Sequence, residues 1–422
     1  MSTGTLALII AALLISEAAA LLLTGYYHRW QKLKTGLGQI NPPAAMPLSP
    51  GSALLRPGGK QPWSGFRELE VKRRVYEDAD RQICSFYLAP LDGQPLPPFQ
   101  PGQFLTFRLI VEDSGGSGTL TRCYSLSDRP RSDYYRVTIK RVAGSAGEAG
   151  LPPGRGSNYF HDHMEPGSRL QVKAPTGRFH LDLESDRPMA LIGGGIGITP
   201  MLSMLEHLLK NGSKREIWLF YGVRNGGEAI MSQHLRTLAQ QHANFHLHLC
   251  FSQPLEGDLK DGNYQHYGRV DIDLLRRTLP LAGYQFYLCG PQPMMQSLVP
   301  GLGALGINPT DIHYEAFGPA SLPGGGPTTQ DLPPEGATAH QVYFRRSDRR
   351  VTWHPGAGSL LELAEAEGIE VDSGCRAGSC GACQTRLVSG DVHYESPPDA
   401  DIESGHCLLC TSTPDSDLVL QL

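Results

Sequence analysis

The chain of 422 residues is too long for one ordinary domain, and at about 150 residues per domain it predicts three. Its 37 basic and 42 acidic residues give a net charge of −5, so the charge balance does not favour nucleic-acid binding or the selection of highly charged ligands.

The first apolar segment, residues 6–23, contains 18 residues, of which only Ser16 and Glu17 are polar. This length falls in the range of about 17–25 residues that spans the hydrocarbon of a bilayer. A cleaved signal peptide normally has Lys or Arg before its apolar run, and no basic residue precedes this segment. Basic and aromatic residues follow it instead, which predicts a single-pass anchor with the rest of the chain in the cytoplasm. These residues are Tyr26, Tyr27, Arg29, Trp30, Lys32 and Lys34. A signal peptide and an amphipathic surface helix are the alternatives.

Two segments, 36–62 and 318–338, are rich in Pro and Gly and show neither a helical nor a strand period. We interpret both as linkers. They divide the chain into an anchor, a central body and a tail.

The central body shows two patterns in succession. From Trp63 to about Leu183, short segments rich in β-branched and aromatic residues alternate with Gly, Pro and Asp turns, which predicts a small antiparallel barrel. From Met189 onward, apolar strands alternate with helical segments, which predicts a parallel sheet with helices on both faces.

The turn GGGIGITP, residues 193–200, joins a predicted strand to a predicted helix. Its glycines have no Cβ, so a pyrophosphate can approach the backbone N–H groups at the helix N-terminus. Pro200 suits a first helical turn, and it stands where the common dinucleotide fingerprint has its third glycine. The turn is a candidate phosphate cradle, and a tight structural turn is the alternative. The glycines are Gly193, Gly194, Gly195 and Gly197.

Three cysteines of the tail lie within nine residues on a loop of small side chains, and a fourth follows after 26 residues. The spacing C-x4-C-x2-C is that with which plant-type ferredoxins hold a [2Fe-2S] cluster. Four thiolates can also hold zinc, although zinc sites usually contain two C-x2-C pairs. Cys407 is the rival for the last ligand. The predicted ligands are Cys375, Cys380, Cys383 and Cys410. With five further cysteines scattered along the chain, this usage predicts a reducing compartment.

Six short motifs of the central body resemble, in order, those of the ferredoxin–NADP reductase superfamily. They are RCYS at 122–125, GRGSNYFH at 154–161, GGGIGITPM at 193–201, YGVR at 221–224, CGPQPMM at 289–295 and YEAFG at 314–318. The resemblance covers residues 65–318 and is greatest to flavohaemoglobin-type reductases. The tail resembles plant-type ferredoxin over residues 340–422. The order flavin, nicotinamide, ferredoxin is that of oxygenase-coupled reductases, from which the predicted anchor is a departure.

The resemblance implies a multidomain chain of α/β and β parts. After a transmembrane helix it implies an antiparallel six-stranded flavin-binding barrel, a parallel-sheet nucleotide-binding domain and a β-grasp [2Fe-2S] ferredoxin domain. The expected bounds are an anchor with its basic flank at 1–35, a linker at 36–62, the FAD-binding barrel at 63–183, the NAD(P)-binding domain at 184–317, a linker at 318–338 and the ferredoxin domain at 339–422.

The resemblance also implies roles for single residues. Arg122 would pair with the flavin phosphate, Tyr124 would lie on the isoalloxazine, and Ser125 would hydrogen-bond near flavin N5. Gly156, Ser157 and Asn158 would contact the pyrophosphate. Ser125, Cys289 and Glu315 are the expected catalytic residues. The expected nucleotide-binding residues are Gly194, Gly195, Gly197, Thr199, Tyr221, Arg224, Gly290 and Pro291.

These roles predict an NAD(P)H-dependent oxidoreductase at the cytoplasmic membrane. A hydride would pass from the nicotinamide to the flavin, and single electrons would pass through the cluster to an external acceptor protein. We favour FAD over FMN and NADH over NADPH. An oxygenase or desaturase, a quinone or a haem protein would each fit as acceptor. The alternatives are a respiratory NADH:quinone reductase component, whose known counterpart has the ferredoxin domain first, and a redox-sensing or adapter protein without turnover.

Overall fold

The computed structural model describes residues 62–113, 116–144, 153–317, 339–376, 378–394, 398 and 400–422. The described residues form one compact unit. Three predicted segments lie outside the described residues and remain predictions: the anchor at 1–35, residues 36–61 of the first linker, and the second linker at 318–338. None of the helices in the described residues is long and apolar enough to cross a membrane.

The first sheet is antiparallel and has six strands in the order β4-β3-β6-β1-β2-β5. An isolated bridge between Leu126 and Val137 joins the residue after β4 to β5, so the two edge strands of the sheet curl toward each other. Side chains alternate in and out along each strand, and the inward set forms one apolar core. The strands are β1 (Arg67–Tyr76), β2 (Ile83–Pro90), β3 (Phe104–Asp113), β4 (Gly116–Ser125), β5 (Tyr135–Lys140) and β6 (Arg169–Val172).

Helix α2 (Arg155–His163) packs on this sheet through Phe160, which is fully buried. The Phe160 ring lies edge-on to Phe86 at 5.3 Å and to Tyr124 at 5.1 Å between ring centroids. These contacts place the N-terminus of α2 beside the C-terminal half of β4.

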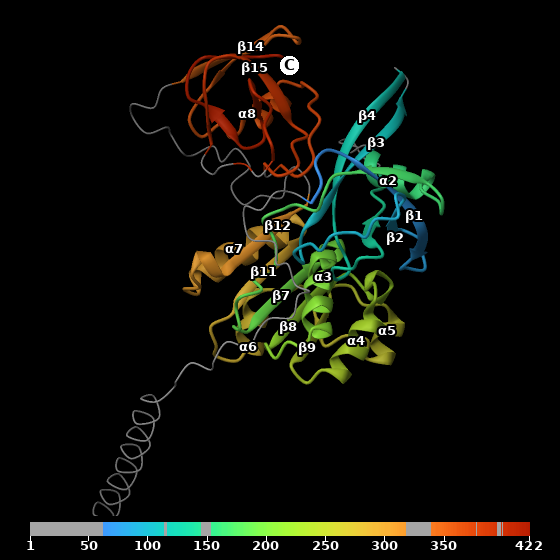
Figure 1. Ribbon diagram of the computed structural model, residues 1–422. Coiled ribbons are helices and arrows are strands. Elements are labelled where there is room, and N and C mark those ends of the chain that lie inside the picture. Colours follow the sequence, from blue (N-terminus) through green and yellow to red (C-terminus); the bar gives the residue numbers. More distant parts are fainter. Residues whose placement is uncertain are drawn as a thin grey trace, which may run out of the picture. The chain divides into compact units, whose positions relative to one another are not determined.

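The second sheet is entirely parallel, in the order β10-β9-β8-β7-β11-β12. Alternate residues of its central strand serve two cores: Met189 and Leu191 pack with α3 and α4, whereas Ala190 and Ile192 pack with α6 and α7. Helices therefore cover both faces, as predicted (Figure 1). The strands are β7 (Met189–Gly194), β8 (Ile217–Val223), β9 (Phe245–Phe251), β10 (His266–Tyr267), β11 (Gln285–Gly290) and β12 (Ile312–Ala316). The helices are α3 (Ile198–Lys210), α4 (Ser232–Gln241), α5 (Glu256–Asp261), α6 (Ile272–Thr278) and α7 (Gln292–Ala304), with 3-10 turns at Gly195–Gly197, Gly226–Glu228 and Pro309–Asp311.

The third sheet is mixed and has five strands in the order β14-β13-β19-β15-β17, beside a separate pair of β16 with β18. One helix, α8 (Leu360–Ala366), packs its leucines into the core of this sheet and begins with a capping box at Ser359. The strands are β13 (His340–Phe344), β14 (Arg349–Trp353), β15 (Gln384–Ser389), β16 (Val392–Tyr394), β17 (His406–Leu408), β18 (Ser412–Pro414) and β19 (Leu418–Leu420).

The glycine turn between β7 and α3 is a point of close backbone approach. Gly195 has φ +55, in the left-handed region that favours glycine. Gly197 has an ordinary helical backbone, but a Cβ there would clash with the carbonyl oxygen of Cys289 and lie 2.8 Å from the nitrogen of Gly290. The two glycines therefore meet different constraints, one of conformation and one of space.

Gly197→Ala should destabilise the protein more than Gly195→Ala does. Alanine at Gly195 meets no atom within 4 Å, so its cost is the left-handed backbone, about 1–2 kcal/mol. Alanine at Gly197 meets backbone atoms that cannot rotate away, and we expect about 3 kcal/mol or more. Thermal unfolding of the two variants beside wild type measures the difference. Equal melting temperatures for the two variants would contradict the close approach of α3 and β11.

Candidate functional site

The carboxyl ends of parallel strands β7, β8, β11 and β12 bring together most of the predicted nucleotide-binding residues. Strand β7 lies between β8 and β11, where the chain order of the sheet reverses, and ligands of such sheets bind at this point. A Cβ at Gly194 would lie 2.7 Å from Pro291 and 2.8 Å from the sulfur of Met294, so the Gly290–Pro291 segment packs directly on the glycine turn. The turn and the start of α7 thus form one edge.

Helix α3 begins at this edge without a side-chain cap, since its N-cap residue is Gly197. The buried hydroxyl of Thr199 donates to the carbonyl oxygen of Ile196 at 3.0 Å, within the same turn. An uncapped helix N-terminus with backbone free of Cβ atoms is a ready anion site. The turn fits the phosphates of a dinucleotide.

The predicted catalytic residues also lie together. Ser125 Oγ, at the end of β4, donates to Glu315 Oε2 at 3.1 Å. Glu315 on β12 stands opposite Cys289 on β11 in the strand register. Burial raises the pKa of the half-buried Glu315 carboxyl to about 8, and burial together with the Glu315 charge raises the pKa of the Cys289 thiol well above its usual range. Ser125 thereby connects the curled sheet to the parallel sheet.

Arg122 and Tyr124 face the N-terminus of α2. A Cβ at Gly156 would lie 2.6 Å from Arg122 Cγ and 3.0 Å from the Tyr124 hydroxyl, so only glycine lets the helix approach this closely. The N-cap residue of α2, Gly154, provides no side-chain cap. A guanidinium beside an uncapped helix N-terminus is chemically suited to a flavin phosphate.

Ser157 and Asn158 tie this helix to the segment after β5. Ser157 Oγ accepts from the Val142 N–H at 3.2 Å and donates to the Gly154 carbonyl at 3.1 Å. Asn158 Nδ2 donates to the Val142 carbonyl at 3.1 Å. Their side chains thus position the helix N-terminus, whose backbone faces the expected phosphate.

Two predicted nucleotide-binding side chains have other partners. Tyr221 is fully buried in the core, and its hydroxyl donates to the Glu228 carbonyl at 3.3 Å. Arg224 Nε donates to Glu228 Oε1 at 2.8 Å, and Lys140 Nζ reaches the same oxygen at 3.5 Å. Hydrogen bonding from Arg224 lowers the pKa of Glu228. The acidic partner lies four residues after Arg224, a spacing at which oppositely charged side chains commonly pair.

The four predicted cluster ligands form two pairs of neighbouring thiols. The Cys375 N–H donates to Cys380 Sγ and the Cys380 N–H to Cys375 Sγ, both at 3.3 Å, while the Cys410 N–H donates to Cys383 Sγ at 3.4 Å. Further N–H groups from Ser379 and Ala382 also point at these sulfurs. Within the described residues no group of three or more His, Cys, Asp or Glu is arranged for one metal ion. A [2Fe-2S] cluster divides four thiolates over two irons, and the two pairs of thiols suit this division.

Two neighbours of the thiols bear on the fit of a cluster. The Thr411 hydroxyl is buried and has no hydrogen-bond partner among the described residues, and it lies 3.2 Å from where a Cβ on Gly378 would stand in the cluster loop. A buried hydroxyl at this position suits a ligand with sulfur acceptors. Cys407 lies on β17 opposite Thr385, is fully buried in the apolar core, and has its pKa raised to about 12 by burial.

The cluster loop, defined here as residues 372–383, contacts the first sheet. Asp372 Oδ1 accepts from the Thr121 N–H at 3.2 Å, and the Ser373 carbonyl accepts from Arg122 Nη1 at 3.2 Å. Lys173 Nζ donates to the Cys380 carbonyl at 2.9 Å. No motif marks Thr121 or Lys173 in the sequence, and sequence reasoning missed both.

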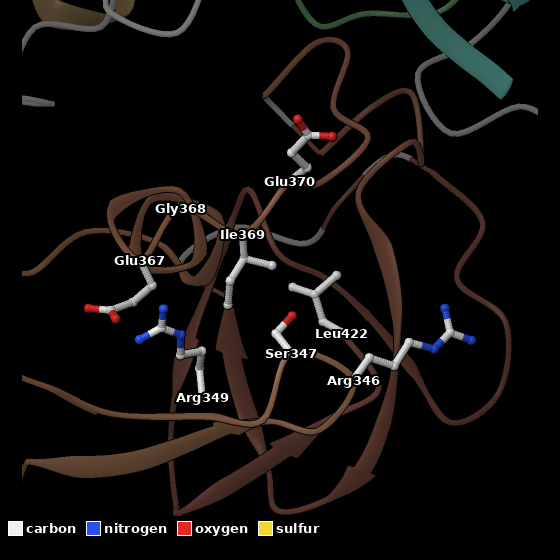
Figure 2. Close-up of a pocket in the computed structure, with 8 residues that line it drawn as sticks. All are labelled: Arg346, Ser347, Arg349, Glu367, Gly368, Ile369, Glu370 and Leu422. Carbon is white, nitrogen blue, oxygen red and sulfur yellow. The ribbon is translucent and has the colours of Figure 1, made fainter. Parts of the chain in front are cut away.

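A shallow pocket of about 400 Å³ lies on the third domain and contains none of the predicted site residues. Figure 2 shows Leu422, the last residue of the sequence, near Ser347 and Ile369, with the arginine and glutamate side chains of the lining around them. The Leu422 carbonyl accepts from the Ser347 N–H at 3.0 Å, so this pocket forms around the anchored C-terminus. Its lining residues are Arg346, Ser347, Arg349, Glu367, Gly368, Ile369, Glu370 and Leu422.

Two family models match the chain. The oxidoreductase NAD-binding domain matches residues 191–299, and the 2Fe-2S iron-sulfur cluster binding domain matches residues 342–415. The first range covers most of the parallel sheet, and the second lies within the domain that contains the four thiols.

Known proteins match the flavin and nucleotide part. The flavohemoprotein of Halalkalibacterium halodurans is 39% identical over 264 residues, which cover 63% of this chain and 62% of that protein. The chain thus spans less than two thirds of the length of the curated flavohemoproteins it matches. The solved FAD/NAD binding domain of nitric oxide dioxygenase from Vibrio cholerae is 31% identical, with TM-score 0.52, over 60% of this chain and 100% of that one. The structure of phthalate dioxygenase reductase is 28% identical, with TM-score 0.49, over 85% of this chain and 98% of that one.

A complete FAD/NAD-binding domain at this identity, followed by a matched iron-sulfur domain, settles the family and the cofactors together. The chain belongs to the ferredoxin–NADP reductase superfamily, as an NAD(P)H-dependent oxidoreductase with a C-terminal [2Fe-2S] domain whose cofactors are FAD, NAD(H) and a [2Fe-2S] cluster.

Proposed function

We propose that the protein is a membrane-anchored reductase that passes electrons from NADH through FAD and the cluster to an external acceptor protein, such as an oxygenase or a desaturase. One strand carries this proposal. Residues 121–125 of β4 contact the cluster loop at Thr121 and Arg122 and contact Glu315 at Ser125. Three residues of strand, from Arg122 to Ser125, span about 10 Å, so the nucleotide site and the cluster loop meet on one short stretch of backbone.

The residues of this strand have separable tasks. When bound, the flavin supplies the conversion of a hydride into single electrons, and the cluster supplies one-electron transfer. Arg122 and the N-terminus of α2 would hold the flavin phosphates by charge and by N–H donation. The glycine turn would hold the phosphates of the dinucleotide. Ser125 and Glu315 would place a hydroxyl and a carboxyl beside the reacting rings.

The anchor, the location at the cytoplasmic membrane and the acceptor are proposed on the sequence. The apolar segment 6–23 and the basic residues after it support an anchor whose soluble domains face the cytoplasm. An acceptor that is itself membrane-associated would then diffuse in the same plane.

Glu315 holds a proton at neutral pH, because burial raises the pKa of its carboxyl to about 8. A protonated carboxyl avoids an unpaired negative charge in the site while it still accepts from Ser125. Between the usual pKa of glutamate, about 4.3, and about 8, the folded protein retains a proton that the unfolded chain has lost. Stability contributed by the neutral carboxyl is therefore fully present below that range and is lost as pH rises through it.

Glu315→Gln should flatten this pH dependence. As pH rises from 5 to 9, the melting temperature of the wild-type holoprotein should fall relative to that of the variant. The fall should be about 2–4 °C for each ~1 kcal/mol that the wild type loses in its free energy of unfolding. Thermal unfolding at several pH values measures the difference. Parallel profiles for the two proteins would contradict a proton held on Glu315.

Flavin and cluster chemistry should be separable by mutation. Cys380→Ala removes a cluster ligand, so iron and delivery to a cluster-dependent acceptor should be lost while NADH still reduces ferricyanide. Arg122→Ala removes a phosphate contact, so flavin content and both activities should fall while iron remains. Iron and flavin content, with the two assays, measure this. Tightly bound zinc without iron in the wild type would contradict the proposal.

The same measurements test the last ligand. Cys410→Ala should lose the cluster as Cys380→Ala does, because Cys410 is paired with Cys383. Cys407→Ala should retain it, because this thiol lies in the apolar core. Loss of the cluster in the Cys407 variant and retention in the Cys410 variant would reverse the assignment.

Glu228 supports NADH as the electron donor. It follows β8, the second strand of the nucleotide-binding sheet, and in such sheets an acidic residue in this region binds the ribose 2′-hydroxyl of NAD. Arg224, which could otherwise meet a 2′-phosphate, is paired with this carboxylate. A 2′-phosphate would therefore have to compete with Glu228 for Arg224.

Glu228→Gln should raise kcat/KM for NADPH by about tenfold, since it frees Arg224 from the competing carboxylate and a gain of about 1.4 kcal/mol has this effect. The value for NADH should change little or fall. Glu216→Gln is the matched control, because Glu216 precedes β8 at the opposite end and pairs with His246. An unchanged NADPH value in the Glu228 variant would show that Glu228 does not set the preference.

A further inference from the structure

Strand β4 presents different side chains on its two faces. Arg122 and Tyr124 face Gly156 and the N-terminus of α2. Successive residues of a strand point to opposite faces. Cys123 accordingly points the other way, toward Thr106, its partner in the β3–β4 register, with 3.4 Å between Thr106 Oγ1 and Cys123 Sγ. One residue thus separates the expected flavin face of β4 from the side on which the cluster loop lies.

The Cys123 thiol lies beside a predicted cluster ligand. Its Sγ and that of Cys380 are less than 6 Å apart, on either side of the same glycine. Gly374 lies beside both sulfurs: a Cβ on it would stand 2.9 Å from Cys123 Sγ and 3.0 Å from Cys380 Sγ. Any side chain at Gly374 would press on this contact. Cys123 comes from the flavin barrel and Cys380 from the tail, so the contact exists only while the cluster loop lies on β4.

Donor and acceptor chemistry fixes the direction of a hydrogen bond between these two sulfurs. A cysteine that ligates iron is a thiolate, which can only accept. Cys123 is not a predicted ligand, and its thiol carries one S–H that can be donated. The Thr106 hydroxyl can donate to Cys123 Sγ and leave that hydrogen directed at Cys380. The reverse order would set a sulfur lone pair of Cys123 against the thiolate.

We propose that Cys123 is a positioning residue that donates its S–H to the Cys380 thiolate and so raises the reduction potential of the cluster. Reduction adds one negative charge to the cluster, and a hydrogen bond to a ligand sulfur stabilises the reduced form more than the oxidised form. This inference rests on the proposed function, in which Cys380 is a ligand. With this hydrogen bond, docking of the cluster loop on β4 makes reduction of the cluster more favourable.

A redox titration of the full-length holoprotein, followed by the EPR signal of the reduced cluster, tests the proposal. Cys123→Val removes the donor and keeps a β-branched residue in the strand. It should shift the reduction equilibrium about tenfold toward the oxidised form, which is 59 mV for one electron. Cys123→Ser keeps a donor and should lie closer to wild type than Cys123→Val does. Cys84→Ala, a buried cysteine of β2 in the same barrel, is the matched control and should leave the potential unchanged.

Gly374→Ala tests the same contact from the cluster loop, should Cys123→Val fail to assemble a cluster. Its Cβ would push the two sulfurs apart, so the potential should move in the same direction. A wild-type potential in either variant that retains its cluster would overturn the inference. A wild-type protein that binds flavin but shows no [2Fe-2S] signal would instead overturn the proposed function, so the two failures are distinguishable.

Discussion

The contact between the end of β4 and its two neighbours is the constraint on which the arrangement of the site depends. Five successive residues of this strand contain three hydrogen-bond donors. The Thr121 N–H donates to Asp372, the Arg122 guanidinium to the Ser373 carbonyl, and the Ser125 hydroxyl to Glu315. The first two partners belong to the cluster loop and the third to the parallel sheet. A shift of β4 by one residue would turn every one of its side chains to the opposite face and break all three contacts together. The register with β3, unbroken over the whole of β4, prevents such a shift.

Glycine is what allows these elements to approach. Gly156 lets α2 lie against Arg122 and Tyr124, Gly197 lets α3 lie against the end of β11, and Gly374 lets the cluster loop lie against Cys123. In each case the neighbouring atom would be within 3 Å of a Cβ. Each of the three glycines therefore stands at one junction: helix to flavin strand, helix to nucleotide strand, and cluster loop to flavin strand. A pattern of glycines that looks like a set of separate turns in the sequence is, in space, a set of interfaces between the elements of the site.

Local chemistry was predictable from the sequence, and long-range pairing was not. The cysteine spacing and the glycine turn identify themselves, because their ligands demand that residue type at that separation. Thr121 and Asp372 are hydrogen-bonded to each other although they are 251 residues apart, and no periodic or compositional signal in the sequence joins them. Tyr221 shows a different limit: its motif suggested a ligand contact, but the strand pleat turns the side chain into the core. Cys123 was visible inside the RCYS motif, yet only the cluster loop beside it gives its thiol a role.

Placing a hydrogen-bond donor and its acceptor on different domains has a consequence that a contact within one domain would not have. Interactions such as the Lys173 bond to the Cys380 carbonyl hold the loop by its backbone and leave the charge on the sulfurs almost unchanged. A bond to Cys380 Sγ acts on the charge that changes during reduction, so its strength differs between the two redox states. By thermodynamic reciprocity, if docking of the loop on β4 raises the reduction potential of the cluster, reduction of the cluster strengthens docking by the same free energy. The reduced cluster would then be held on β4 more firmly than the oxidised one, and an acceptor must supply enough binding energy of its own to draw the loop away.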